Sequence, residues 1–417
     1  MFANYICALD IGSSKIASAV AQIKRGCIAD IFFESLPVKG MQKGIIIDSI
    51  ELSDCLARTL KNLKVKSGIN IKSLNLNLSG GQIITKNSHA VIPLAERASR
   101  IITGSDIRKV NEQARILGLS LEEEIIHQIP FSYNIDSKSN ILNPLGLYSH
   151  RLEVDLYLVC AKTASLQSLL RVVNQAGYEM KELFFSGIAT SGVVFGKELK
   201  QGINILCDIG SDITELLVFK EGLLRDIEVL SIGGNDLTEG LSEALRIPLE
   251  LAEDIKRSYA IVADSSQTKE DQEILIKKNN IYKPIKQSLV SEIITSKAKL
   301  IYETIKDRIQ KKIPCDEVNN FVISGRSVLL EGFLEGLEDT LGVSVKIARI
   351  THPSMASLVN KNDALTSGRY LTYLIPLGII SQLLYNGQTQ FPYARGPARN
   401  PFLNIINRVK EVYQEYF

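Results

Sequence analysis

Two short segments about two hundred residues apart share one order: strand, Asp-Ile-Gly, polar turn and second strand. The first contains Asp10 and the second contains Asp208. A tight hairpin with glycine and hydroxyl side chains in its turn can direct several backbone N–H groups at one anion. A carboxylate that ends the first strand can hold the water shell of Mg²⁺. We therefore predict two phosphate-binding loops, one formed by Gly12, Ser13, Ser14 and Lys15, and one formed by Gly210, Ser211, Asp212 and Thr214.

A third segment strengthens the interpretation of these loops. A single Asp-Ile-Gly also fits an ordinary tight turn, because short motifs match by chance. The strand Phe321–Ser324 runs into Gly325, Arg326 and Ser327, which we predict to contact adenosine. Taken alone, this segment is more typical of a plain strand-to-helix turn. The three segments together predict an ATP cleft in which Asp10 and Asp208 hold Mg²⁺ through water.

Composition limits the class of protein. A chain of 417 residues with 45% apolar composition exceeds the usual size of one hydrophobic core, so we expect two or more packed domains. The net charge of +2 gives no overall field that favours nucleic acid. The six cysteines are scattered without a Cys-x-x-C pair, which indicates thiols in a reducing compartment. The four histidines and the cysteines form no catalytic or metal-ligand spacing.

The positions of apolar runs argue against export and against a membrane span. The chain enters a strand-like run at Tyr5, without the basic and apolar regions of a signal peptide. The longest apolar stretch, near 371–385, contains Pro376 and Gln382 and is shorter than the roughly 18 residues that a span requires. We therefore expect a protein that stays in the cytoplasm and does not cross a membrane.

The order of the three cleft segments resembles that of the actin, Hsp70 and sugar-kinase superfamily, and most specifically the bacterial cell-division protein FtsA. Further FtsA-like segments are Ile126–Pro130 with Asp136, Asn143–Gly146, Arg151–Val154, Ser231–Thr238 and Ala252–Lys256. The resemblance implies an α/β, actin-like (ribonuclease H-like) two-lobed ATPase fold with an inserted subdomain and a C-terminal amphipathic helix. It also implies that Gly233 and Gly234 flank the phosphates and that Glu253 and Lys256 touch the ribose, although a Glu-Lys pair at this spacing is also typical of a surface ion pair.

The resemblance also implies a division of the chain. We expect subdomain 1A at 1–83, 163–195 and 370–385, subdomain 1C at 84–162, subdomain 2A at 196–230 and 285–369, subdomain 2B at 231–284, a flexible tether at 386–400 and a membrane-targeting helix at 401–417.

Five positions depart from the pattern that the resemblance implies. Ser211 and Asp212 stand in a loop that is usually glycine-rich, and Asp212 would place negative charge near a phosphate. Glu215 replaces a usual aspartate, and Arg326 and Ser327 replace glycines in the adenosine turn. Side chains at glycine positions restrict close backbone approach. We therefore expect weak ATP binding and at most a weak ATPase.

The last residues predict an amphipathic helix. Asn400-Pro401 supplies an N-cap and a proline at the first helical position. Packing on the protein's own body is the common fate of such a helix. The tether before it and the basic residues Arg395, Arg399, Arg408 and Lys410 instead favour an anionic bilayer. The predicted membrane-facing residues are Phe402, Ile405, Ile406, Val409, Val412, Tyr413, Tyr416 and Phe417.

The resemblance implies a function. We expect an ATP-binding cell-division protein of the divisome that forms actin-like filaments on the cytoplasmic face of the inner membrane at the septum. It would anchor the FtsZ ring there and contact itself and other division proteins. The alternatives are a pilus-assembly scaffold of the PilM type or an actin-fold kinase or ATPase. A kinase would need a catalytic aspartate and a sugar pocket, and an Hsp70 would need a long domain after the ATPase.

Overall fold

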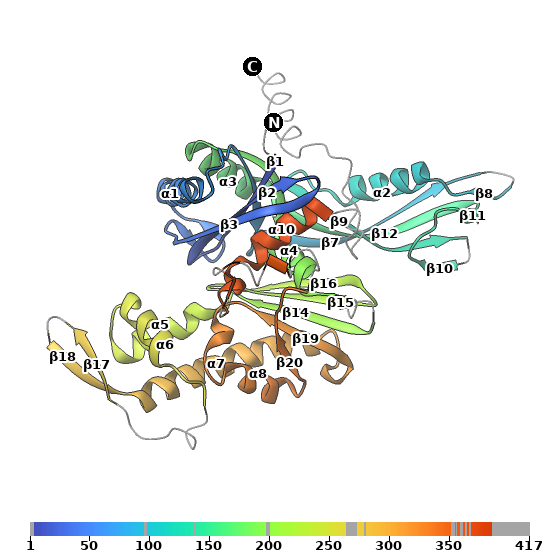
Figure 1. Ribbon diagram of the computed structural model, residues 1–417. Helices are drawn as coiled ribbons and strands as arrows, with labels where there is room; N and C mark the ends of the chain where they lie inside the picture. Colours follow the sequence, from blue (N-terminus) through green and yellow to red (C-terminus); the bar gives the residue numbers. More distant parts are fainter. Residues whose placement is uncertain are drawn as a thin grey trace.

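The computed structural model shows a two-lobed molecule with an inserted subdomain (Figure 1). It describes residues 4–385, apart from 96–97, 137, 197–200, 264–272, 279–280, 352–354, 356, 359–361, 363–364 and 367. The predicted tether (386–400) and terminal helix (401–417) lie outside the described residues.

The first lobe is built on a five-stranded sheet in the order β13-β6-β1-β2-β3. Strands β1, β2 and β3 form an antiparallel meander, and β6 and β13 continue the sheet parallel to β1. The strands are β1 (Asn4–Ile11), β2 (Lys15–Lys24), β3 (Cys27–Pro37), β6 (Ser73–Leu78) and β13 (Glu179–Phe185).

The second lobe repeats this arrangement. Its sheet has the order β16-β15-β14-β19-β20, again with an antiparallel meander followed by two parallel strands. The strands are β14 (Ile203–Ile209), β15 (Thr214–Lys220), β16 (Leu223–Leu230), β19 (Val318–Ser324) and β20 (Val345–Ile347). Because the first hairpins of the two sheets correspond, the internal repeat predicted from the sequence is present in the structure.

Helices cover both sheets, and two of them are shared. Helices α1 (Ser49–Ser67) and α3 (Thr163–Gln175) pack on the outer face of the first sheet, and α7 (Gln287–Gln310) and α8 (Phe333–Leu341) pack on that of the second. Helices α4 (Ser186–Val194) and α10 (Leu374–Tyr385) lie between the sheets (Figure 1). They approach closely, since a Cβ on Gly378 would lie 1.9 Å from the Ala189 carbonyl oxygen.

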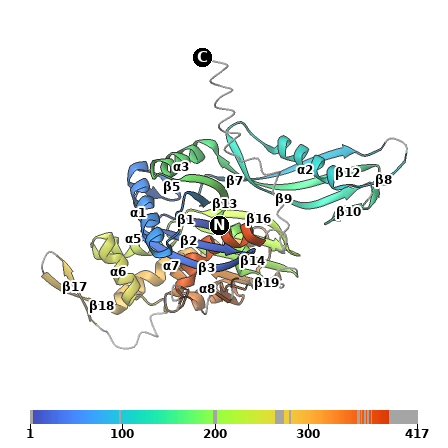
Figure 2. The same cartoon turned by 45° about the horizontal axis from the view of Figure 1, so that its top comes forward.

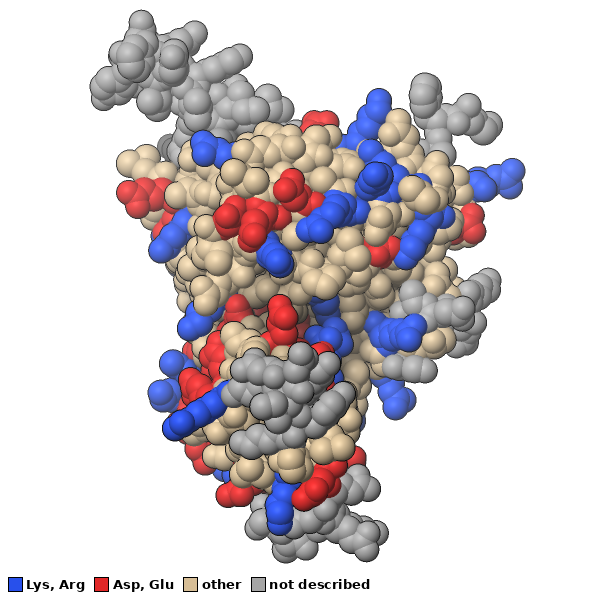
Figure 3. All heavy atoms as spheres, turned by 90° about the vertical axis from the view of Figure 1, so that its left-hand side faces the viewer, with Lys and Arg blue, Asp and Glu red and all other residues tan. Residues whose placement is uncertain are grey.

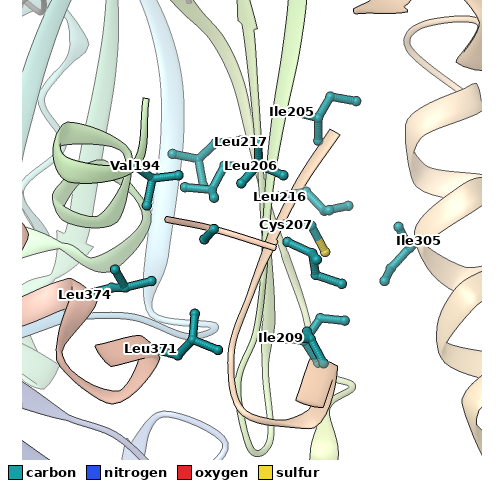
Figure 4. Packing of buried hydrophobic residues seen from close by; sticks show 14 of the residues in the cluster. Val194, Ile205, Leu206, Cys207, Ile209, Leu216, Leu217, Ile305, Leu371 and Leu374 are labelled. Atoms are coloured by element: carbon teal, nitrogen blue, oxygen red, sulfur yellow. The ribbon is translucent and has the colours of Figure 1, made fainter. Parts of the chain in front are cut away.

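Alternation along β14 connects the layers of the second lobe (Figure 4). Ile205, Cys207 and Ile209 point towards α7, which contributes Ile305, while Leu206 points towards Val194 of α4. All six side chains are at most 3% exposed. A strand that is buried on both faces is expected to be apolar throughout, and β14 follows this pattern except at Asn204 and Asp208.

The inserted subdomain has its own sheet and core. Its four-stranded sheet has the order β10-β9-β12-β7, and α2 covers one face. The capping box of Thr103 and Asp106 fixes the start of α2. In Figures 1 and 2 this subdomain extends away from both lobes. Its elements are β7 (Ile83–Pro93), β8 (Arg100–Ile101), α2 (Gly104–Gly118), β9 (Glu123–Ile135), β10 (Lys138–Ile141), β11 (Tyr148–Ser149) and β12 (Arg151–Lys162).

Several smaller elements complete the fold. Helices α5 (Gly234–Leu245) and α6 (Leu249–Tyr259) pack beside α7, and the hairpin of β17 and β18 lies beyond them. A two-residue turn joins β4 to β5 in the first lobe. The remaining elements are β4 (Met41–Gln42), β5 (Ile45–Ile46), β17 (Glu273–Lys278), β18 (Ile281–Lys286), η2 (Cys315–Glu317), η3 (Ser327–Leu329) and η5 (Arg369–Tyr373).

The described residues contain no helix that is long and apolar enough to cross a membrane. On the face seen in Figure 3, basic and acidic side chains are interspersed over both halves of the molecule. This mixture agrees with the near-neutral net charge of +2. The two-lobed α/β architecture that the sequence predicts is confirmed.

Candidate nucleotide-binding cleft

The turns after β1 and β14 have the same backbone geometry. The Gly12 N–H donates to the Lys15 carbonyl at 3.0 Å, and the Gly210 N–H donates to the Ile213 carbonyl at 2.8 Å. A Cβ on Gly210 would lie 2.8 Å from the Ile213 carbonyl oxygen, so only glycine fits this turn without a shift. Both predicted phosphate loops are therefore tight hairpin turns, and they line one cleft between the lobes.

The two aspartates that end the first strands are held in equivalent ways. Asp10 accepts a hydrogen bond from Asn77 Nδ2 of β6 at 2.7 Å, and Asp208 accepts one from Ser324 Oγ of β19 at 2.8 Å. In each lobe the donor comes from the parallel neighbour of the strand that carries the aspartate. Both carboxylates are thus oriented at the base of the cleft.

Burial raises the proton affinity of both carboxyl groups. Burial raises the pKa of Asp10 to about 7, the charge of Lys15 opposes the increase, and the charge of Asp208 adds to it. Burial also raises the pKa of Asp208. Two carboxylates with restricted access to water need a compensating cation. Hard oxygen donors of this kind are typical ligands of Mg²⁺, either directly or through water.

Lys15 supplies the positive charge in this part of the cleft. Burial lowers the pKa of Lys15 to about 8, and Asp10 opposes the decrease. Its Nζ donates to Thr372 Oγ1 of η5 at 3.4 Å. At neutral pH the ammonium is charged and lines the cleft beside the first turn, where it can contact a phosphate.

The predicted adenosine turn is packed onto the second phosphate loop. Gly325 has a φ of +101°, and a Cβ there would lie 2.0 Å from the Ile209 carbonyl oxygen. A Cβ on Gly234 would lie 2.3 Å from Ser327 Oγ. The Gly234 N–H also donates to the Gly210 carbonyl at 2.9 Å. The adenosine turn, the second phosphate loop and the start of α5 are therefore in mutual contact.

Glu253 and Lys256 on α6 form a network of hydrogen bonds and ion pairs within the second lobe. Lys256 is 6% exposed, and its Nζ donates to the Gly234 carbonyl at 2.9 Å and to Thr238 Oγ1 at 2.7 Å. The same Nζ lies 2.6 Å from Glu253 Oε2, and Glu253 Oε1 accepts from Arg257 Nε at 2.7 Å. Burial disfavours the charge of Glu253, but these partners hold its pKa below the ordinary value. Lys256 thus anchors the start of α5 as well as lining the cleft.

The cleft has a volume of about 370 Å³. Fifteen of the seventeen nucleotide-binding residues predicted from the sequence line it. Thr214 and Gly233 do not: the Thr214 hydroxyl is fully buried and donates to the Ile232 carbonyl, while the Gly233 N–H donates to Asp236. In the structure these two residues make hydrogen bonds that shape the second loop, and their contact with a nucleotide stays a prediction.

Several residues of the cleft were not predicted. Ser79 contacts Glu215 across the cleft, and Asn235 contacts Asp212. The strand 73–78 followed by Ser79-Gly80 repeats the strand-to-Ser-Gly pattern of 321–325, which was the available signal. The unpredicted lining residues with polar side chains are Asn77, Ser79, Gln82, Ser165, Ser186, Glu215, Asn235 and Arg257.

These observations fit a nucleotide with Mg²⁺. A Cβ on Gly12, Gly210 or Gly325 would meet a backbone carbonyl oxygen, so these tight turns favour glycine. The carboxylates of Asp10 and Asp208 and the ammonium of Lys15 provide the complementary charges. Within the described residues, no group of three or more His, Cys, Asp or Glu side chains forms an all-protein metal site. A cation here would therefore take its remaining ligands from water and phosphate, as Mg²⁺ commonly does.

Comparison with known families identifies two segments of this chain. A family model described as "Cell division protein FtsA" matches residues 205–360, and one described as "SHS2 domain inserted in FTSA" matches residues 80–160. Together the two models match more than half of the chain. The second match covers most of the inserted subdomain.

Curated relatives carry the same description. The chain is 26% identical over 351 residues to the cell division protein FtsA of Borreliella burgdorferi, covering 83% of this chain and 85% of the relative. It is 28% identical over 396 residues to FtsA of Buchnera aphidicola subsp. Baizongia pistaciae, covering 93% and 91%. The similarity therefore extends over nearly the whole length of both proteins.

Solved structures share the fold at lower identity. The PilM-PilN type IV pilus biogenesis complex matches with a TM-score of 0.63 and 15% identity over 91% of this chain and 98% of that one. MreB5 of Spiroplasma citri bound to ADP gives 0.53 and 11% over 92% and 98%, and a MamK double helical filament gives 0.52 and 11% over 90% and 98%. These similarities establish an actin-like fold. At 15% identity, the similarity to the PilM complex shows a shared fold and no shared function.

Proposed function

Since this chain belongs to the FtsA family of actin-like cell-division proteins, we propose that it binds ATP with Mg²⁺ in the cleft between its lobes. The observation that carries the proposal is the convergence of two equivalent hairpin turns, each with a buried aspartate, on one cleft. Asp10 and Asp208 would hold Mg²⁺ through water, and Lys15 would contact the phosphates. The ion would neutralise phosphate charge. MreB5, which shares the fold, was solved with ADP.

The adenosine would lie on the second lobe. Gly325, Arg326 and Ser327 line the cleft beside Glu253 and Lys256. The positive φ of Gly325 brings this turn against β14, which leaves its outer edge free to face a ring system. Arg326 is exposed in the cleft and carries a planar guanidinium that can stack on an adenine. We expect slow ATP hydrolysis at most.

A titration with ATP tests the nucleotide half of the proposal. The full chain is titrated with ATP in Mg²⁺ and in EDTA, and saturable binding that weakens without Mg²⁺ is expected. Asp208→Asn should remove most of the Mg²⁺ dependence, whereas Asp30→Asn, at an exposed position of β3, should not change it. Absence of saturable binding in Mg²⁺ would reject the nucleotide role.

We also propose that the chain polymerises and that filaments link the FtsZ ring to the cytoplasmic face of the cell membrane at the division septum. The division role is supported by the similarity to curated cell division proteins FtsA. The filament is supported by MamK, which shares the fold and was solved as a double helical filament. The amphipathic pattern of 401–417 supports attachment to lipid. One helix of this size binds reversibly, so many copies in a filament would give firm attachment.

Co-sedimentation with anionic liposomes tests the membrane half. The full chain should sediment with the liposomes, and a chain stopped at Asn400 should remain in solution. Ile406→Glu, on the apolar face, should weaken binding strongly, while Asn407→Glu, on the polar face, should have a small effect. Equal sedimentation of the full and the shortened chain would reject the anchor. Electron microscopy of the bound fraction, with and without purified FtsZ, tests the filament and the link.

A further inference from the structure

The turn between β4 and β5 lies against the second phosphate loop, at the edge where the two lobes meet. Lys43 and Gly44 form this two-residue turn, with φ values of 48° and 73°. The left-handed region is unfavourable for a residue other than glycine, so the turn needs external contacts to hold Lys43 there. Those contacts come from both phosphate loops.

The two N–H groups of the turn donate to side chains of opposite lobes. The Gly44 N–H donates to Ser13 Oγ of the first loop at 3.3 Å. The Lys43 N–H donates to Asp212 Oδ2 of the second loop at 2.7 Å. A hydrogen bond to a charged acceptor at this distance is among the stronger kinds. The turn therefore bridges the two phosphate loops.

Asp212 is held in position by its own lobe. Its other carboxylate oxygen, Oδ1, accepts from Asn235 Nδ2 of α5 at 2.5 Å and from Ser211 Oγ at 3.4 Å. With both oxygens bonded, the side chain has a defined direction across the cleft. Asn235 is itself fixed, because its N–H donates to the Ser211 carbonyl at 2.7 Å.

Close packing of Gly44 lies beside this hydrogen bond. A Cβ on Gly44 would lie 2.8 Å from Ile213 Cδ1 and 3.0 Å from Gly80 Cα, and Gly44 and Gly80 are both buried. Ser79, next to Gly80, contacts Glu215 of the second lobe. The β4–β5 turn, the Ser79-Gly80 turn and the second phosphate loop thus form one contact zone made entirely of protein groups.

We propose that Asp212 is an interlobe clasp: its carboxylate ties the second phosphate loop to the Lys43 N–H and holds the cleft closed at this edge without help from a nucleotide. Closure of this chain would therefore depend on its own side chain rather than on a bound ligand alone. The inference concerns the lobe contact and stands apart from the proposed ATP role.

Amide hydrogen exchange on the nucleotide-free full chain tests the clasp. A peptide that contains Lys43 and Gly44 should exchange about tenfold faster in Asp212→Ala than in the unaltered chain, because exchange requires the N–H to open. Asp212→Asn retains an oxygen acceptor and should keep most of the protection. The Arg25-Gly26 turn of β2 and β3 is the matched internal control: it has φ values of 52° and 77°, and a Cβ on Gly26 would meet no atom within 4 Å.

The outcomes are distinct. Equal exchange at Lys43 in the unaltered chain and in Asp212→Ala, with both proteins folded by circular dichroism, would overturn the clasp. Faster exchange at both the Lys43 turn and the Arg25 turn would also overturn it, since that result indicates general loosening. A second measurement with Mg²⁺ and ATP separates the two proposals. Failure of every variant to bind ATP would reject the nucleotide role and leave the exchange result to decide the clasp.

Discussion

The first and second phosphate loops share a backbone turn but carry opposite charges. Each turn closes with one hydrogen bond from a glycine N–H to the carbonyl three residues later. In the first loop the last residue is Lys15, and in the second it is Ile213, preceded by Asp212. In the strands next to each turn, Asp10 lies opposite Ala17 in the register of the first hairpin, and Asp208 lies opposite Glu215 in the second. The first loop thus carries a positive charge that suits an anion, and the second carries a carboxylate that bonds to the opposite lobe.

The largest effect should follow from removing the single cation of the first loop. Lys15→Met keeps the apolar stem and removes the charge, so we expect ATP affinity to fall about 100-fold, the scale of a lost charged hydrogen bond. Ile213→Met, at the equivalent position of the second loop, should change the affinity less than about threefold. Isothermal titration calorimetry measures both. Equal losses in the two variants would mean that the loops are not functionally different.

The glycines of the two turns should differ in their tolerance of a methyl group. A Cβ on Gly210 would lie 2.8 Å from the Ile213 carbonyl oxygen, and one on Gly12 would lie 3.3 Å from the Lys15 carbonyl oxygen. Gly210→Ala should lower the free energy of unfolding by about 2 kcal/mol, and Gly12→Ala by less than about 1 kcal/mol. Denaturant titration measures both values. The reverse order would show that the second turn relaxes more easily than its geometry indicates.

Glu215, which has no acidic counterpart in the first hairpin, should make stability depend on pH. Burial raises the pKa of Glu215 to about 8, the Ser79 hydroxyl opposes the increase, and Asp208 adds to it. As pH rises from the ordinary value of about 4.5 towards 8, the unfolded chain loses this proton while the folded chain keeps it, so stability falls. Glu215→Gln does not titrate, so its stability relative to the unaltered chain should rise by about 2.5 kcal/mol between pH 5.5 and pH 7.5.

Thermal unfolding at the two pH values measures this difference. Ala17, which occupies the matching register position in the first hairpin, offers the control: Ala17→Ser introduces a polar group without a titrating one. It should shift stability equally at both pH values. A pH-independent gain in Glu215→Gln would contradict the elevated pKa.

A smaller effect should appear in the pH dependence of Mg²⁺-dependent ATP binding. The pKa of Asp10 is raised to about 7 by burial, so lowering the pH from 8 to 6 protonates this carboxyl group. A protonated carboxyl is a poor partner for a hydrated cation, and we expect a loss of about fivefold in Mg²⁺-dependent affinity over this range. Asp10→Asn should flatten the profile. An unchanged slope in that variant would assign the titration to another group.

Local sequence predicted the parts of the cleft that depend on local geometry. The two hairpin turns and the Gly325 turn were predicted because a strand, a glycine and a short polar loop occur together in sequence. The residues that complete the cleft come from distant segments: Asn77 meets Asp10 across 67 positions, and Asp212 meets Lys43 across 169. No local pattern reports such pairs, because they depend on how the strands are ordered in the sheets.

A different reason, strand alternation, explains why Thr214 does not line the cleft. Thr214 lies in the second loop segment, but as the first residue of β15 its side chain faces inward and bonds to the Ile232 carbonyl. Strand alternation places each neighbour on the opposite face, so membership in a motif does not decide which side a residue occupies. Asp212 has a contact that its motif did not predict. It was predicted as a charge near a phosphate, and its carboxylate also bonds to the opposite lobe.

Strand β12 makes the inserted subdomain a lever. Its 12 residues extend over roughly 40 Å, and its inner end, Lys162, passes directly into α3, whose Ser165 and Leu169 line the cleft. Over that length, a rotation of about 5° at the inner end displaces the outer end by about 3 Å. If α3 moved when the cleft is filled, the displacement would therefore be larger at the far tip than in the cleft.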